Sequence, residues 1–119
     1  MKLLDNLKVC IALAALATLS NPTFAADGVI AITSPANGAV LQSSAENKLE
    51  FNVKLSPTGN HLHIYVDDHD PIIDRDIGHC PCSITLPKLA PGKHVIAIKE
   101  ATASHALTGV EGTVTITSK

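Results

Sequence analysis

The chain has 119 residues, of which 9 are Lys or Arg and 11 are Asp or Glu, and its formal net charge is −2. This length allows one folded domain with a core of modest size. The slightly acidic balance disfavours nucleic acid and anionic lipid surfaces as partners.

The first 25 residues have the features of a secretory signal peptide. Lys2 and Lys8 flank the start of an apolar run over 9–19 that is too short to span a bilayer, and small residues occupy Thr23 and Ala25. We expect cleavage after Ala25, which leaves residues 26–119 as a soluble domain in the bacterial periplasm or outside the cell. We expect no membrane insertion of this domain. It retains 7 basic and 10 acidic residues and all 6 histidines.

After the signal, hydrophobic residues recur with a period of two, in short runs separated by Gly, Pro, Asn and Ser. Such runs predict β-strands, and no segment has a helical period. The predicted strands cover 28–33, 39–43, 48–56, 61–67, 71–74, 83–86, 93–101 and 110–117, of which 39–43 and 71–74 are brief edge strands. This spacing predicts an all-β fold, an immunoglobulin-like Greek-key sandwich of about seven strands.

The strand over 61–67 is the most informative segment. Leu62, Ile64 and Val66 alternate with His61, His63 and Tyr65, so we expect the aliphatic side chains in the core and the polar ones facing solvent. Two histidines at positions i and i+2 lie on the same face of a strand and can direct two imidazole rings at one point. They form either a metal site or only a solvated polar face.

Strand order suggests which loops share an end of the sandwich. Consecutive strands run in opposite directions, so the start of strand 61–67, the start of strand 83–86 and the loop after strand 93–101 should share one pole. This would gather the candidate ligands His61, His63, His79, Cys80, Cys82 and His105. Imidazole suits Cu(II) and Zn(II), so His105 could complete a three-nitrogen site with the pair on the strand.

Cys80-Pro81-Cys82 has two interpretations. The thiolates could bind Cu(I) or Zn(II) together with His79, or take part in thiol redox chemistry. Alternatively, an exported protein with an even number of cysteines can join them in a disulfide. An extended pair two residues apart lies near the upper Cα separation for a disulfide, about 7 Å, which weighs against the bridge.

Two strings resemble periplasmic copper-resistance CopC-like proteins. They are Ser34-Pro-Ala-Asn-Gly-Ala-Val-Leu41, and the run Leu86-Pro-Lys-Leu-Ala-Pro-Gly92 followed by a strand and the Ser104-His105 loop. The resemblance implies a cupredoxin-like sandwich that binds copper, with His105 at the position of a family ligand. The histidine that begins the family's mature chain is missing near Ala26, and Ala103-Ser104 stands where the family has an aspartate.

We therefore expect a small periplasmic metal-binding protein for metal handling or resistance, with a copper ion, or zinc as the alternative. His61, His63 and His105 would hold the oxidised ion, and His79, Cys80 and Cys82 a reduced one. The alternative is a non-enzymatic immunoglobulin-like interaction or structural module of a secreted or surface complex, with a periplasmic protein partner. We expect no catalytic residues, because the sequence shows no nucleophile elbow, no phosphate loop and no pair of acids with a cleft behind it.

Overall fold

The structure is a computed structural model that describes residues 27–119, so the predicted signal peptide over 1–25 lies outside the described residues. The described part is all β, with eight strands and no helix. The strands are β2 (Val29–Ser34), β3 (Val40–Leu41), β4 (Lys48–Lys54), β5 (His61–Val66), β6 (Ile72–Asp74), β7 (Cys82–Thr85), β8 (Gly92–Ala101) and β9 (Leu107–Ser118). Within residues 27–119, no helix is long and apolar enough to cross a membrane.

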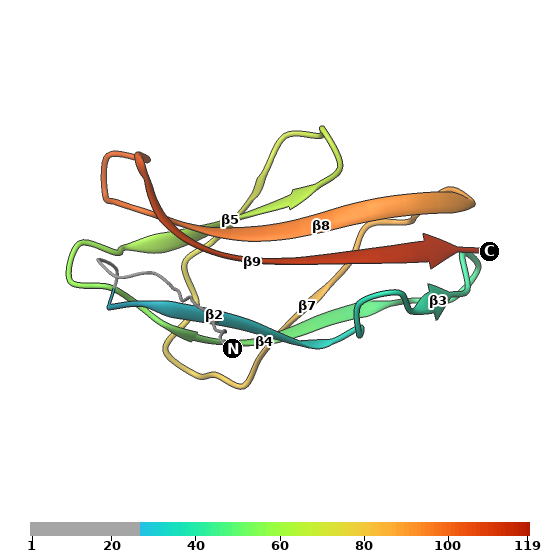
Figure 1. Cartoon of the computed structure of the whole chain (residues 1–119), viewed down its shortest axis with the longest axis horizontal. Helices are drawn as coiled ribbons and strands as arrows, with labels where there is room; N and C mark the ends of the chain where they lie inside the picture. Colours follow the sequence, from blue (N-terminus) through green and yellow to red (C-terminus); the bar gives the residue numbers. More distant parts are fainter. Residues whose placement is uncertain (1–26) are drawn as a thin grey trace, which may run out of the picture.

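The strands form two sheets that pack face to face (Figure 1). One sheet has the order β2-β4-β7, and the other has the order β3-β9-β8-β5-β6. All neighbours are antiparallel except β3 and β9, which are parallel. The predicted immunoglobulin-like sandwich is confirmed.

Alternating side chains build the core between the two sheets. In β4, Leu49 and Phe51 are fully buried, whereas Lys48, Glu50 and Asn52 face solvent. Aliphatic side chains from both sheets and from the segment between β7 and β8 complete this core, namely Ile30, Leu62, Ile64, Val66, Leu86, Leu89, Ile96, Ile98, Val110, Val114 and Ile116, together with Cys82. Period-two patterning therefore places the inward-facing side of each strand correctly.

The outer face of β5 differs from the expectation. Leu62, Ile64 and Val66 face the core as predicted, but His61 and His63 are also buried, with exposed fractions of 0% and 7%. Of the two interpretations of this pair, a solvated polar face does not fit the burial of both rings. Alternation identifies the two faces of a strand, but it does not show whether another segment covers the outer one.

The β8–β9 hairpin brings a loop toward the start of β5. β8 lies between β5 and β9, with His61 of β5 opposite Ala101 at the end of β8. β9 begins at Leu107, three residues before the predicted start, because Leu107 pairs with Ala101. The hairpin loop is therefore short, and it contains His105.

Candidate metal centre

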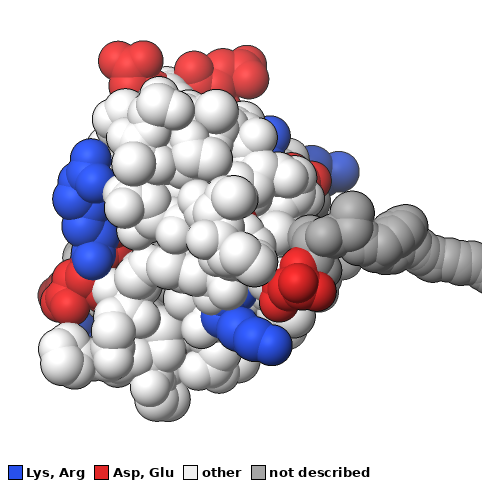
Figure 2. Space-filling view, turned by 90° about the vertical axis from the view of Figure 1, so that its left-hand side faces the viewer, with Lys and Arg blue, Asp and Glu red and all other residues white. Residues whose placement is uncertain are grey.

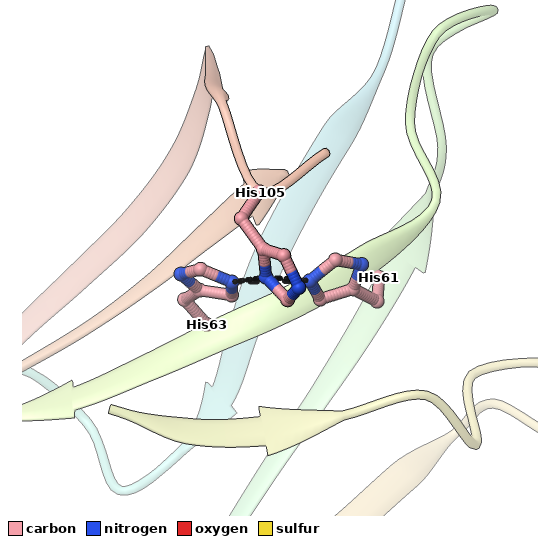
Figure 3. A group of neighbouring side chains, drawn as sticks. All are labelled: His61, His63 and His105. Atoms are coloured by element: carbon pink, nitrogen blue, oxygen red, sulfur yellow. Dashed lines mark hydrogen bonds between the residues drawn. The ribbon is translucent and has the colours of Figure 1, made fainter. Parts of the chain in front are cut away.

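Three histidines from two segments converge at one end of the five-stranded sheet (Figure 3). His61 and His63 project from β5, and His105 reaches them from the β8–β9 loop. Nε2 of His61 lies 3.0 Å from Nε2 of His63 and 3.1 Å from Nδ1 of His105. Nε2 of His63 lies 3.3 Å from the same Nδ1. One nitrogen of each ring therefore faces a common point.

The three nitrogen–nitrogen distances are nearly equal, and they indicate which coordination geometry the group fits. A tetrahedral ion with metal–nitrogen bonds of about 2.0–2.1 Å holds its ligand nitrogens about 3.3–3.4 Å apart. A square-planar ion would instead place two of three nitrogens across the metal, about 4 Å apart. Separations of 3.0, 3.1 and 3.3 Å match one face of a slightly contracted tetrahedron. In residues 27–119 the group consists of these three side chains, so a fourth ligand would come from outside it.

The loop that carries His105 has a defined conformation. The backbone N–H of His105 donates to the carbonyl of Thr102 (2.9 Å), and Thr102 N–H donates to the carbonyl of Ala106 (2.8 Å). His105 itself has a positive φ of 73°. This left-handed conformation costs a side chain with a Cβ about 1 kcal/mol, and Gly or Asn is usual there. Histidine is one of the residue types that adopt this conformation more often than most.

Polar neighbours contact the far side of both β5 rings. Nδ1 of His61 lies 2.9 Å from Oδ1 of Asn60, and Nδ1 of His63 lies 3.3 Å from the hydroxyl of Tyr65. Nη1 of Arg75 lies 3.3 Å from the Asn60 oxygen and 3.4 Å from Nδ1 of His61. Each ring of the pair thus directs one nitrogen to the common point and the other to a polar partner.

The electrostatics favour neutral imidazoles on β5. Burial lowers the pKa of His61, and the nearby Arg75, His105 and His63 lower it further. Burial also lowers the pKa of His63, with contributions from His105 and Arg75. Metal ions bind the neutral form of imidazole. Because both rings are already neutral at neutral pH, neither has to lose a proton before it can bind an ion.

His79, Cys80 and Cys82 are not part of this group, so the six candidates do not form one cluster. Cys82 begins β7, which pairs with β4 in the three-stranded sheet, whereas the histidines lie on the five-stranded sheet. The strand directions were predicted correctly, but the direction of a strand does not determine the sheet it joins. The chain crosses from one sheet to the other between β6 and β7.

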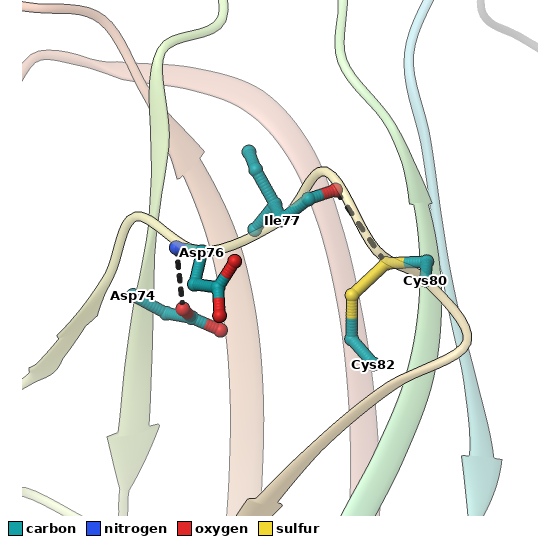
Figure 4. Close-up of a disulfide and its surroundings, with 5 residues drawn as sticks. All are labelled: Asp74, Asp76, Ile77, Cys80 and Cys82. Carbon is teal, nitrogen blue, oxygen red and sulfur yellow. Dashed lines mark hydrogen bonds between the residues drawn. A yellow bond between two sulfur atoms is a disulfide. The ribbon is translucent and has the colours of Figure 1, made fainter.

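Cys80 and Cys82 form a disulfide (Figure 4). Their Cα atoms are 4.1 Å apart, because the segment is bent and not extended as expected. Cys82 faces the core, on the same side of β7 as Ile84, and is only 7% exposed. In this oxidised form the two sulfurs are bonded to each other, so neither can act as a thiolate ligand. His79 is exposed and lines an open pocket of about 200 Å³ with Asp74 and Asp76.

Three residues around the centre were not found from the sequence. Tyr65 shares the parity of His63, which is a usable signal, and Asn60 directly precedes His61. Arg75 carries no local signal, because its place beside β5 depends on the register in which β6 pairs with that strand. The end of the sandwich on the left of Figure 1, which carries the β8–β9 loop, is mostly uncharged, with acidic and basic side chains toward its margins (Figure 2).

No protein-family model and no curated protein matches the sequence. Solved structures do match its fold. Fibronectin(III)-like modules of CbhA from Clostridium thermocellum share 19% identity at a TM-score of 0.58, over 76% of this chain and 96% of theirs. Two structures of the extracellular domain of BT4673 from B. thetaiotaomicron, described as a one component and a hybrid two component system, share 14% and 13% identity.

The two extracellular-domain structures match 82% and 81% of this chain at TM-scores of 0.55 and 0.54, and the chain spans only 16% of each. At these identities the likeness concerns the fold alone. The described domain is therefore an immunoglobulin-like β-sandwich of the kind found in fibronectin(III)-like modules.

Proposed function

We propose that this chain is an exported immunoglobulin-like module that binds one transition-metal ion through His61, His63 and His105. The observation that carries the proposal is the convergence of three ring nitrogens within 3.0–3.3 Å of one another. Facing lone pairs at this distance repel unless a proton or a metal ion lies between them. The module itself is non-enzymatic in this proposal, and its role is to hold the ion.

Two ions fit the donor set. The resemblance of the sequence to periplasmic copper-resistance proteins supports copper and a role in copper handling or resistance in the periplasm. The near-equal nitrogen spacings support zinc or Cu(I), which accept tetrahedral or trigonal ligands, over square-planar Cu(II). Cys80 and Cys82 could contribute to a Cu(I) site only after reduction, at a position separate from the histidines.

A titration of residues 26–119 with Zn(II), Cu(II) and Cu(I) tests the proposal. We expect one ion per chain and a decisive loss of affinity in His105→Asn, because asparagine tolerates the left-handed backbone but removes the imidazole. His79→Ala, which changes a histidine outside the group, should bind as the unmodified protein does. Equal binding by the unmodified protein and His105→Asn would contradict the proposed site.

The fold supports a second role. Solved structures similar to this chain are fibronectin(III)-like modules or parts of extracellular domains, so the sandwich also suits an interaction or structural module of a secreted complex. The two roles are compatible if a partner recognises another face. Affinity purification with the unmodified protein and with His61→Ala/His63→Ala distinguishes them, since a partner of the structural role would remain bound to both.

A further inference from the structure

His61 can bind a metal ion through Nε2 only in one of its two neutral forms. A neutral imidazole carries a single proton, on Nδ1 or on Nε2, and the unprotonated nitrogen is the one that coordinates metal. Nε2 of His61 faces the other two rings, so the proton has to be on Nδ1. The neighbours of Nδ1 therefore determine whether the centre is ready to bind.

Two neighbours compete for this nitrogen, and they favour opposite forms. The oxygen of Asn60, at 2.9 Å, can only accept and so requires a proton on Nδ1. The guanidinium of Arg75, at 3.4 Å, can only donate and would bond to Nδ1 only if that nitrogen were bare. A bond from Arg75 to Nδ1 would move the ring proton to Nε2 and block the metal position.

The shorter contact belongs to Asn60, and Arg75 reinforces it. Nη1 of Arg75 lies 3.3 Å from the same Asn60 oxygen, and this contact fixes which way the amide points, because the amide NH₂ group could not accept from Arg75. His61 is 0% exposed, so with Asn60 and Arg75 in place bulk water does not reach its ring. The resulting chain of contacts runs from Arg75 to Asn60 to His61.

From these contacts we infer that Asn60 is a positioning residue that holds His61 in the Nδ1–H form, and that Arg75 orients Asn60 for this task. The inference rests on the proposed metal site, since it explains how that site is prepared. Partners of this kind on metal-binding histidines typically change metal affinity by about 10–100-fold when removed.

The test uses ¹⁵N NMR of the metal-free protein, which reports the protonated nitrogen of each histidine, together with a Zn(II) titration. In the unmodified protein we expect His61 in the Nδ1–H form. In Asn60→Ala, Arg75 becomes the remaining partner of Nδ1, so we expect the Nε2–H form and an affinity about 10–100-fold lower. Asn60→Asp keeps an acceptor at the same place and should restore both properties.

Two controls separate this role from a general effect on folding. Asn52→Ala changes an exposed asparagine on β4 and should leave the NMR spectrum of His61 and the affinity unchanged. Adding Arg75→Ala to Asn60→Ala removes the competing donor and should return part of the Nδ1–H form. An Nδ1–H signal that persists in Asn60→Ala would overturn the inference.

The two readouts also separate the two proposals. If the unmodified protein does not bind Zn(II), Cu(II) or Cu(I), the proposed metal site fails, whereas the NMR result still decides whether Asn60 sets the form of His61. If binding is tight but is the same in Asn60→Ala, the metal site stands and the role of Asn60 is refuted.

Discussion

Glu100 is a fully buried carboxylate at the end of β8, and its partners explain how the fold tolerates it. Ser56 donates to it from its backbone N–H (2.7 Å) and its hydroxyl, and the Thr108 hydroxyl donates at 2.6 Å. Burial alone would raise the pKa of Glu100, but the hydrogen bonds from Ser56 and Thr108 lower it overall. A charge without such donors would be costly in this position.

Glu100→Gln should destabilise the domain by about 2 kcal/mol, because a neutral amide loses the charge-assisted hydrogen bonds that the carboxylate accepts from Ser56 and Thr108. Urea unfolding at neutral pH measures this loss. Glu111→Gln is the matched control, since Glu111 is exposed and forms only a 3.9 Å surface ion pair with Lys99, worth at most about 1 kcal/mol. Equal stability of the two variants would contradict a structural role for Glu100.

Gly59 is required by the same carboxylate. A Cβ atom at this position would lie only 2.3 Å from Oε2 of Glu100, whose side chain is held in place by its hydrogen bonds. We therefore expect Gly59→Ala to cost about 1–3 kcal/mol by overpacking. Gly78→Ala, where a Cβ would have no neighbour within 4 Å, should change the free energy of unfolding by less than about 0.5 kcal/mol. Thermal and urea unfolding of both variants check this difference.

At the scale of the element, β5 and β8 are joined beyond their ladder by an ion pair at the end far from the three histidines. Nδ1 of His94 lies 2.6 Å from Oδ2 of Asp67, and Nε2 of His94 lies 2.6 Å from the carbonyl of Ala90. Oδ1 of Asp67 accepts from the backbone N–H of Val95 at 2.9 Å. His94 therefore has a structural role at this end of the sheet.

The pair makes stability depend on pH. The hydrogen bonds to Ala90 and Asp67 raise the pKa of His94 above its usual 6.5, so its contribution is complete below pH 6.5 and is lost as the pH rises through the folded-state value. Burial opposes ionisation of Asp67, but the bonds from His94 and Val95 lower its pKa below 3.8. Its contribution is complete above 3.8 and is lost as the pH falls through the folded-state value.

We expect His94→Gln to cost about 1 kcal/mol at pH 5.5, where both charges are present, and clearly less at pH 9. Urea unfolding at the two pH values measures the difference. His79→Gln serves as the control, because His79 is an exposed loop residue and forms no ion pair with a carboxylate of the described residues. A cost for His94→Gln that is the same at both pH values would show that charge on His94 is irrelevant.

The strands show how far sequence reasoning extends. Period-two patterning placed Leu49 and Phe51 in the core, since burial on one face leaves a direct trace in the sequence. It could not show that His61 and His63 are buried, because the β8–β9 loop, whose His105 packs against both rings, lies about forty residues later in the chain. The pairing of His105 with the β5 histidines was nevertheless foreseeable, since antiparallel neighbours bring the start of β5 to the end of β8.

At the scale of the whole molecule, the assignment of strands to sheets determines which candidates meet. The histidines meet because β5 and the β8–β9 hairpin belong to one sheet, and His79 and Cys80 stay apart because they precede β7 of the other. Hydrophobic and polar residues alternate in the same way in both sheets, so no local pattern shows which sheet a strand joins. The burial of Glu100 also depends on the fold as a whole, since its hydrogen-bond donors Ser56 and Thr108 lie on separate segments.

The sandwich should not depend on its disulfide for folding. The bridge between Cys80 and Cys82 closes a ring of three residues, and the chain-entropy relation for so small a loop gives about 1.5 kcal/mol, less than for longer loops. Core side chains from both sheets, including the fully buried Phe51, Leu62 and Ile96, supply the main stabilisation without it.

We therefore expect the reduced protein to remain folded, with a melting temperature lower by roughly 5–10 °C for a domain of this size. Thermal unfolding followed by circular dichroism, with and without a phosphine reductant, measures the shift. Cysteine alkylation under the same conditions confirms that both thiols have been released. Because the bridge lies at the crossing between the two sheets, and the histidines lie within one sheet, reduction should also leave the three-histidine group intact. Unfolding on reduction would show that the bridge, and not the core, holds the sheets together.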